Sequence, residues 1–240
     1  MSKDRIVAIT GAAGALGSAV AEHLGAQGYK VALFDTPRAK DRLGQLAEKL
    51  GAGRASAHAG DFASAEAWRA GIDDVRKALG GPPTHAALIA GGWDGGVPLH
   101  QAEDDGVFTS MVHKNLDTTY YALRALLPAM VEAKHGSIVV VGSRAVERPW
   151  TSTGAAAYAA AKSAVVTLAE VVAAEVLDSG VRVNAILPST MDTPANRASM
   201  PHADASRWVS LPSAAGVVGF LLSDAARDVS GASLPLYGMA

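Results

Sequence analysis

Tyr158 and Lys162 stand four residues apart in an alanine-rich stretch whose pattern predicts a helix. Residues at this spacing lie one turn apart on the same helix face. A free phenol has a pKa of about 10 and is protonated at neutral pH, whereas a nearby cation stabilises the phenolate. Ser143 follows the apolar stretch 137–142 and can hold a carbonyl or alcohol oxygen against the tyrosine hydroxyl. The three residues predict an acid/base site in which Lys162 lowers the pKa of Tyr158.

Composition restricts the chemistry that can surround this pair, because an isolated Tyr-x-x-x-Lys is usually an aromatic residue beside a solvated lysine. The 240 residues contain 21 Lys and Arg, 23 Asp and Glu, and no Cys. The absence of Cys excludes disulfides, thiol nucleophiles and cysteine-ligated zinc, and the His spacings match no metal motif, so we predict no metal. Without a basic run, a signal peptide or a long apolar stretch, we expect no nucleic acid partner, no membrane contact and a cytoplasmic location.

Short apolar runs alternate along the chain with segments of helical periodicity. We expect strands at 6–10, 30–34, 54–58, 84–90, 137–142, 181–187 and 232–236, and helices at 14–26, 41–50, 65–79, 104–134 with a break or bend near Pro128, from Tyr158 to about 177, and 213–223. This alternation predicts a parallel sheet covered by helices on both faces. No linker or repeat interrupts it, so residues 1–240 are expected to form one α/β Rossmann domain, a doubly wound sheet of about seven strands.

The first strand leads into the turn TGAAGALG at residues 10–17. Glycines at 11, 14 and 17 permit a sharp turn, a close approach of the backbone to a pyrophosphate, and tight packing of the following helix. The free N–H groups at the start of that helix attract phosphate. Glycine-rich loops are common, but this one follows a strand and opens a helix, which indicates a dinucleotide site.

Asp35 ends the second predicted strand, where a carboxylate accepts a hydrogen bond from a ribose 2′-hydroxyl and repels a 2′-phosphate. We therefore favour NAD(H) over NADP(H) as the cofactor. Arg38 and Lys40 lie close enough in sequence to accommodate a phosphate, and an Asp before Thr-Pro is also an ordinary turn residue. Asp61 follows the third strand, where it either meets the adenine or caps the helix that begins near Ala65.

The motifs occur in one order along nearly the whole chain: the TG-rich turn, Ala90-Gly91, Asn115, Ser143, Tyr158 with Lys162, and Pro188 with Thr193. In this order the chain resembles the short-chain dehydrogenase/reductase family. The resemblance implies that Tyr158 is the catalytic acid/base, that Lys162 lowers its pKa and binds the nicotinamide ribose, that Ser143 orients the substrate, and that Asn115 supports a proton-relay water. The residues expected at the cofactor are Gly11, Ala13, Gly14, Ala15, Leu16, Gly17, Asp35, Asp61, Phe62, Ala90, Gly91, Gly92, Tyr158, Lys162, Pro188, Thr190 and Thr193.

The chain departs from the family pattern at two places. Ala15 occupies the middle glycine position of TGxxxGxG, and the fourth strand ends Leu88-Ile89-Ala90-Gly91 where the family has Asn-Asn-Ala-Gly. Segments 11–18, 90–96 and 191–208 are similar to the dihydropteridine reductases, NADH-dependent members that reduce quinonoid dihydropterin. Ser143, which those enzymes typically lack, instead favours ketone and alcohol substrates.

Three functions therefore stay open at the level of the sequence. The first is NAD(P)(H)-dependent hydride transfer to or from a carbonyl or alcohol substrate. The second is dihydropteridine reduction, and the third is a dinucleotide sensor without catalysis. Because a sensor has no need of the acid/base residues, the presence of Ser143, Tyr158, Lys162 and Asn115 favours an enzyme.

The long irregular stretch 189–211 follows the sixth strand and predicts a lid over a small-molecule substrate. The residues expected to wall the substrate pocket are Trp93, Trp150, Met191 and Trp208. The helices that carry Ala122, Ala125, Ala164 and Ala169 offer flat surfaces, and the resemblance implies that they pair between subunits of a homodimer or homotetramer.

Overall fold

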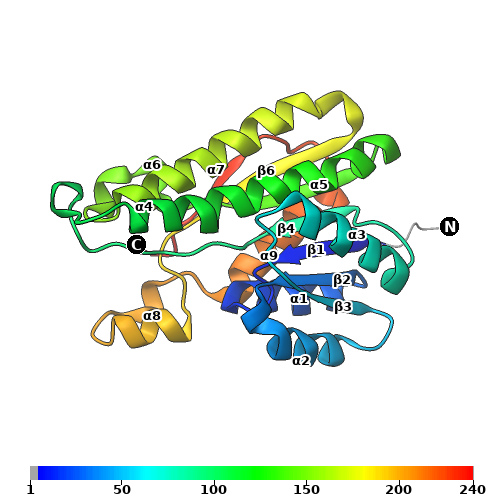
Figure 1. Ribbon diagram of the computed structural model, residues 1–240, viewed down its shortest axis with the longest axis horizontal. Coiled ribbons are helices and arrows are strands. Elements are labelled where there is room, and N and C mark those ends of the chain that lie inside the picture. The colour runs from blue at the N-terminus through cyan, green and yellow to red at the C-terminus, as the bar shows by residue number, and fades with distance from the viewer. Residues whose placement is uncertain (1–4, 240) are drawn as a thin grey trace.

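The computed structural model describes residues 5–239, and this part of the chain forms one seven-stranded parallel sheet (Figure 1). The strands lie in the order β3-β2-β1-β4-β5-β6-β7. Their bounds are β1 Ile6–Thr10, β2 Lys30–Asp35, β3 Ala55–Ala59, β4 His85–Leu88, β5 Gly136–Val141, β6 Val181–Pro188 and β7 Ser233–Leu236. The order reverses between β1 and β4, so a crevice opens beyond the carboxyl ends of these two strands. The predicted doubly wound sheet is confirmed.

Each central strand buries both of its faces, which explains the continuous apolar runs in the sequence. The sheet separates two hydrophobic cores. In β1, Ile6 and Ala8 enter the first core, whereas Val7 and Ile9 enter the second core. Successive side chains of a strand point to opposite faces, so one short sequence supplies both cores. The sheet is therefore packed on both of its faces, which makes it a rigid support for residues at the strand ends.

Two layers of helices cover the sheet. Helices α3 (Ala65–Leu79), α5 (Thr118–Ala133) and α7 (Ala156–Glu175) pack against one face, and α1 (Ala15–Ala26), α2 (Lys40–Leu50) and α9 (Leu211–Leu222) against the other. Figure 1 shows α5 and α7 together on one side and α1 with α2 on the opposite side. Helix α7 is long and apolar enough to cross a membrane by length and composition alone, but it buries Val165 and Ala169 in the first core and is a core helix.

The long helix expected over 104–134 is divided, but the division does not fall at Pro128, where the sequence predicts a break or bend. Helix α4 (Gly106–Met111) passes through a π-helical segment, η3 (Val112–Asp117), into α5, and Pro128 lies inside α5. The wider π turn leaves carbonyls without their usual donors. The Thr119 hydroxyl donates to the carbonyl of Asn115 at 2.9 Å, and the Thr118 hydroxyl donates to that of Lys114 at 2.8 Å. These threonines stabilise the irregular turn.

Two short helices were not expected from the sequence. Helix α6 (Arg144–Glu147) directly follows Ser143, and helix α8 (Pro194–Ser199) lies within the predicted lid. The lid is held at its base, where Met191 and Val209 form an isolated parallel bridge and the Val209 amide donates to the carbonyl of Thr190 at 2.9 Å. The predicted lid that follows β6 therefore contains a helix and is hydrogen-bonded at its base, so it is not an irregular loop.

Candidate active site

A groove of about 910 Å³ runs along the carboxyl ends of the strands at the crevice. It is lined by residues of the first turn, of the ends of β2 and β4, of η3 and of the lid. Among the predicted residues, the lining includes Gly11, Gly14, Ala15, Leu16, Gly17, Asp35, Asp61, Phe62, Ala90, Gly91, Met191 and Thr193. Ala13, Gly92, Tyr158, Lys162, Pro188 and Thr190 are not part of this lining. The groove is large enough for an extended ligand and too open to be a core cavity.

The glycine turn has the shape that a pyrophosphate requires. Gly11 has a φ of +63°, and a Cβ on Gly17 would lie 2.1 Å from the carbonyl oxygen of Gly11, so neither position accepts a side chain without movement. Among the described residues, no side chain caps the N-terminus of α1 at Gly14. The first turn of α1 therefore presents its amides and its positive dipole to the groove. These features fit a dinucleotide phosphate.

Asp35 lies between the glycine turn and the loop that follows β2. Its carboxylate accepts hydrogen bonds from the amide of Ala13 at 2.9 Å and from the amide of Thr36 at 2.7 Å. Arg42 on α2 also lines the groove, whereas Arg38 and Lys40 do not. The carboxylate is thus fixed at the edge of the groove, and Arg42 is the cation that shares this edge with it.

Asp61 and Phe62 line the groove beyond the end of β3. The carboxylate of Asp61 accepts from the amide of Ala63 at 3.1 Å, and α3 is capped by Ser64, whose hydroxyl accepts from the amide of Ala67 at 3.3 Å. The alternative role of Asp61 as the helix cap is therefore wrong. Its carboxylate shapes the turn instead and remains exposed at the groove.

Ser143 and Tyr158 are brought together by β5 and α7. Ser143 is buried beyond the end of β5, and its hydroxyl is the hydrogen-bond partner of the Tyr158 phenol. Burial raises the pKa of Tyr158, and the Ser143 hydroxyl is the group that opposes this effect. The expected lowering of this pKa by the Lys162 ammonium stays a prediction. A hydroxyl beside a phenol is the pair of groups that an acid/base site requires.

Lys162 is buried one turn further along α7. Its ammonium donates to the carbonyl of Val141 at 2.7 Å, which directs it toward the end of β5. Burial lowers the pKa of Lys162 to about 8, because a charged amine loses its hydration there. The pKa still lies above neutral, so the side chain remains mostly cationic at pH 7. The Val141 carbonyl thus fixes the position of this charge at the end of β5.

Gly91 joins Lys162 and Asn115 to the groove. A Cβ at Gly91 would lie 2.6 Å from the Asn115 Oδ1 and 3.2 Å from the Lys162 Nζ, so both polar groups approach the backbone there closely. The Asn115 amide is fully buried, donates to the carbonyls of Met111 and Gly92 at 2.9 and 3.1 Å, and accepts from the amide of Gly92 at 3.2 Å. Asn115 thus holds the strand end that faces Lys162.

Some of the predicted lid residues line the groove, and the others belong to the base of the lid. Met191 and Thr193 line the groove, and the Thr193 hydroxyl caps α8 by accepting from the amide of Asn196 at 3.1 Å. Pro188 ends β6, and the Thr190 carbonyl belongs to the base of the lid. The base of the lid therefore covers one end of the groove.

The tryptophans expected to wall a substrate pocket do not gather there. Trp93 is 65% exposed and Trp150 is 73% exposed, while Trp208 is half-buried. None of the three lines the groove. Of the expected pocket residues, only Met191 lies at the groove.

Some lining residues were missed from the sequence. Thr10 ends β1, and its hydroxyl accepts from the amide of Ala90 at 3.0 Å, which ties β4 to the glycine turn. Its place directly before Gly11 was a usable signal. The others come from β2, α2, η3, α5, α8 and the loops, where no local pattern marks them: Phe34, Thr36, Pro37, Arg42, Gly60, Ile89, His113, Lys114, Thr118, Pro194 and Ala195.

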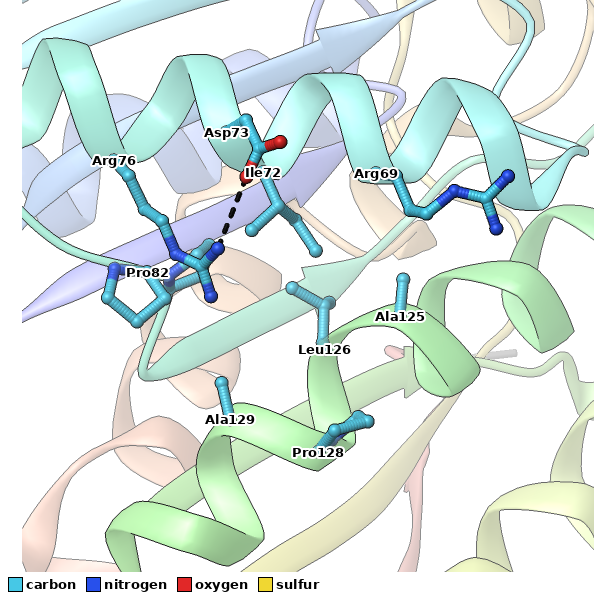
Figure 2. A pocket seen from close by; sticks show the side chains of 10 residues that line it. Arg69, Ile72, Asp73, Arg76, Pro82, Ala125, Leu126, Pro128 and Ala129 are labelled. Atoms are coloured by element: carbon cyan, nitrogen blue, oxygen red, sulfur yellow. Dashed lines mark hydrogen bonds and ion pairs between the residues drawn. The ribbon is translucent and has the colours of Figure 1, made fainter.

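A smaller cavity of about 330 Å³ lies between α3 and α5 (Figure 2). Ile72 and Leu126 point toward each other across it, and Arg76 pairs with Asp73 at 3.2 Å on its rim. It shares no residue with the groove. The motifs that the sequence analysis identified all lie elsewhere, so this cavity is no part of the candidate site.

Comparison with known proteins agrees with the geometry. The family model for short chain dehydrogenases matches residues 5–204. The chain belongs to this family. It is therefore an NAD(P)-dependent oxidoreductase of the short-chain dehydrogenase/reductase type.

Individual relatives resemble the chain along almost its full length. It is 29% identical to a 2,5-dichloro-2,5-cyclohexadiene-1,4-diol dehydrogenase of Sphingobium indicum, over 98% of this chain and 95% of the relative. It is 30% identical to the 3-oxoacyl-(acyl-carrier-protein) reductase of Pseudomonas aeruginosa, over 98% and 96%. A crystal structure of a 3-oxoacyl-(acyl-carrier protein) reductase from Brucella melitensis with bound NAD matches with a TM-score of 0.85 and 30% identity, over 99% of this chain and 91% of that one.

Proposed function

We propose that this enzyme transfers hydride between a nicotinamide cofactor and a small carbonyl or alcohol substrate, with Tyr158 as the acid/base. The observation that carries the proposal is the hydrogen-bonded pair of Ser143 and Tyr158 beyond the end of β5. A paired hydroxyl and phenol can bind one substrate oxygen and move one proton at it. The named relatives act on alcohols and ketones of very different size, so they do not choose among substrates.

When bound, the nicotinamide supplies or takes up the hydride at its C4 atom. In reduction, Tyr158 gives its proton to the substrate oxygen as hydride reaches the carbon, and in oxidation the phenolate takes that proton back. Ser143 donates to the same oxygen and fixes its direction. Lys162 places a positive charge at the end of β5. Asn115 holds the backbone at Gly92, next to Gly91, which lies close to the Lys162 ammonium.

We further propose NAD(H) as the preferred cofactor. The supporting contact is the Asp35 carboxylate, which two amides fix at the groove edge and which would repel a 2′-phosphate. Arg42 is the cation that favours NADP(H) at the same edge. The structural relative with bound NAD supports the first assignment by likeness alone.

Dihydropterin reduction remains a second candidate because three segments, 11–18, 90–96 and 191–208, are similar to the dihydropteridine reductases. All three segments supply residues of the groove, among them Gly11, Gly91 and Met191. The buried Ser143 beside Tyr158 favours the carbonyl substrate, since a serine hydroxyl there has a substrate oxygen to hold.

We also propose a homodimer or homotetramer that pairs the outer faces of α5 and α7. Tyr120, Val131 and Val171 expose apolar surface on these helices. The small residues Ala122 and Ala169 face the subunit's own core, so the interface would not rest on them. Light scattering of the purified protein measures the mass, and a monomer over the working concentration range contradicts the assembly.

The activity is tested by mixing the purified protein with NADH or NADPH and a panel of ketones, 3-oxoacyl thioesters and quinonoid dihydropterin, while the nicotinamide absorbance is followed. We expect NADH oxidation with a ketone or 3-oxoacyl substrate. Turnover of dihydropterin alone would favour the second candidate. The absence of turnover with every substrate of the panel, in a protein that binds NADH, would contradict the proposed function.

A further inference from the structure

Tyr237, which directly follows β7, makes four contacts that the reaction chemistry does not explain. Its ring packs against the first hydrophobic core, and the Arg148 guanidinium lies 4.9 Å from the ring centroid. Its hydroxyl donates to the Glu147 Oε2 at 2.6 Å, and its carbonyl accepts from the Ser189 hydroxyl at 2.8 Å. One residue therefore joins the start of the lid to the end of α6.

Helix α6 is the element that carries Ser143 at its start. The Ser143 hydroxyl caps it by accepting from the amide of Ala145 at 3.2 Å, and Glu147 ends it. A helix this short is not stable alone, so its placement depends on outside contacts. The bond from Tyr237 to the Glu147 carboxylate is charge-assisted, the stronger kind of hydrogen bond, and it fixes the end of α6 opposite Ser143.

The residues after Tyr237 are attached to the other end of the lid. The Met239 amide donates to the Arg207 carbonyl at 3.0 Å, and the Arg207 guanidinium donates to the Met239 carbonyl at 2.6 Å. Gly238 has a φ of +63°, and a Cβ there would lie 2.6 Å from the Arg207 oxygen. The tail 237–239 thus contacts both ends of the segment 189–208 as well as α6.

We propose that Tyr237 is a positioning residue: its hydroxyl holds α6 against the base of the lid and so keeps Ser143 in hydrogen-bond contact with Tyr158. This inference rests on the proposed function, because it assigns Tyr237 a role at the same pair. Burial and the Glu147 carboxylate raise the pKa of Tyr237 to about 12, so the phenol remains a donor throughout the working pH range.

The test replaces Tyr237 with Phe, which keeps the ring beside Arg148 and removes only the hydroxyl. The matched control is Tyr121→Phe, since Tyr121 on α5 is also partly buried against the first core and its hydroxyl has no hydrogen-bond partner among residues 5–239. With a substrate that the wild type turns over, we expect kcat of Tyr237→Phe to fall about tenfold while NADH affinity stays within about twofold.

Two further readouts separate positioning from general damage. The Ser143 bond lowers the pKa of Tyr158, so its loss should move the pH midpoint of alcohol oxidation upward in Tyr237→Phe. Hydrogen exchange of the segment 143–150 should become faster in this variant and not in the control. Glu147→Gln, which keeps an acceptor oxygen but removes its charge, should show the same effects in weaker form.

An unchanged kcat, pH midpoint and exchange rate in Tyr237→Phe would overturn the inference. An equal loss of kcat and of NADH affinity would also overturn it, because that result would show general damage to the fold and not a displacement of Ser143. If the wild type turns over no substrate of the panel, the proposed function fails by that result, and the exchange rate of 143–150 alone then decides whether Tyr237 holds α6.

Discussion

At the scale of single residues, the chemistry depends on how two hydroxyls and one amine share the space beyond β5. Burial makes the Tyr158 phenol a weaker acid, and the Ser143 hydroxyl partly reverses this. The amine of Lys162 is held by the Val141 carbonyl, so its charge supports the site without a direct contact to the phenol. In the proposed mechanism, Ser143 therefore both donates to the substrate oxygen and lowers the pKa of Tyr158.

Replacing Ser143 with Ala should lower kcat by about 100-fold, because the substrate oxygen loses a donor and the Tyr158 phenol loses its partner. It should also cost about 1 kcal/mol of unfolding free energy, since Ser143 caps α6. The matched control is Ser64→Ala, which removes the corresponding cap of α3. Turnover assays and urea unfolding measure the two effects. Equal kcat values for the two variants would contradict the role of Ser143.

The proposed cofactor preference also rests on one residue. Asp35→Asn keeps an oxygen that accepts from Ala13 but removes the negative charge. We expect the ratio of NADPH affinity to NADH affinity to rise at least about tenfold, because the 2′-phosphate no longer meets a like charge. Fluorescence titration with both cofactors measures the ratio. Asp41→Asn, an exposed carboxylate in the first turn of α2, is the control, and an Asp35→Asn ratio equal to that of the control would contradict the assignment.

At the scale of elements, close backbone contacts fix the glycine turn. A Cβ at Gly17 would lie 2.1 Å from a carbonyl oxygen, whereas a Cβ at Gly44 on α2 meets no atom within 4 Å. Gly17→Ala should therefore destabilise the protein by about 1–3 kcal/mol and weaken NADH binding. Gly44→Ala should stabilise it by about 0.5–1 kcal/mol and leave binding unchanged. Thermal unfolding and NADH titration compare the two, and tight NADH binding by Gly17→Ala would contradict the phosphate role of this turn.

The π-helical segment η3 is the element that the sequence least revealed. Its buried Asn115 bonds Met111 and Gly92, and Thr119 supplies the donor that the wide turn removes. The result is a helix that changes register beside the groove and brings Lys114 and Thr118 to its wall. Irregular helices of this kind often occur at functional sites.

At the scale of the whole molecule, the two edges of the sheet differ. The carboxyl edge carries the groove, and the amino edge buries His85 at the start of β4 beside Tyr29 and His135. Burial is the largest of the causes that lower the pKa of His85 to about 3, because the charged form of the ring loses its hydration there. This edge makes the fold sensitive to acid without any part in catalysis.

Unfolding experiments at different pH test this edge. A His that titrates at 6.5 when unfolded and near 3 when folded stabilises the protein above pH 6.5, and this contribution is lost as the pH falls from 6.5 toward 3. We expect a loss of about 2 kcal/mol between pH 7 and pH 5 from this residue. His85→Phe should remove that part of the slope, and His100→Phe, at an exposed position, should not. An unchanged slope in His85→Phe would contradict the pKa.

The sequence predicted most of the fold because its strands are continuous apolar runs between helices of clear periodicity, as in β1 and α1. It also predicted the glycine turn, Asp35, Ser143 and Tyr158, whose residue types and order are specific. It did not predict η3, α6 or α8, since short and irregular turns depend on distant hydrogen bonds such as that between Asn115 and Gly92. For the same reason it missed Arg42 and the bond that directs Lys162 to Val141.

The most direct test of the account replaces Tyr158 with Phe and measures both turnover and cofactor affinity. The variant keeps the ring and removes the one group proposed to exchange a proton with the substrate. We predict that turnover is lost while NADH binds nearly as tightly as in the wild type. Turnover at the wild-type rate would contradict the assignment of Tyr158 as the acid/base.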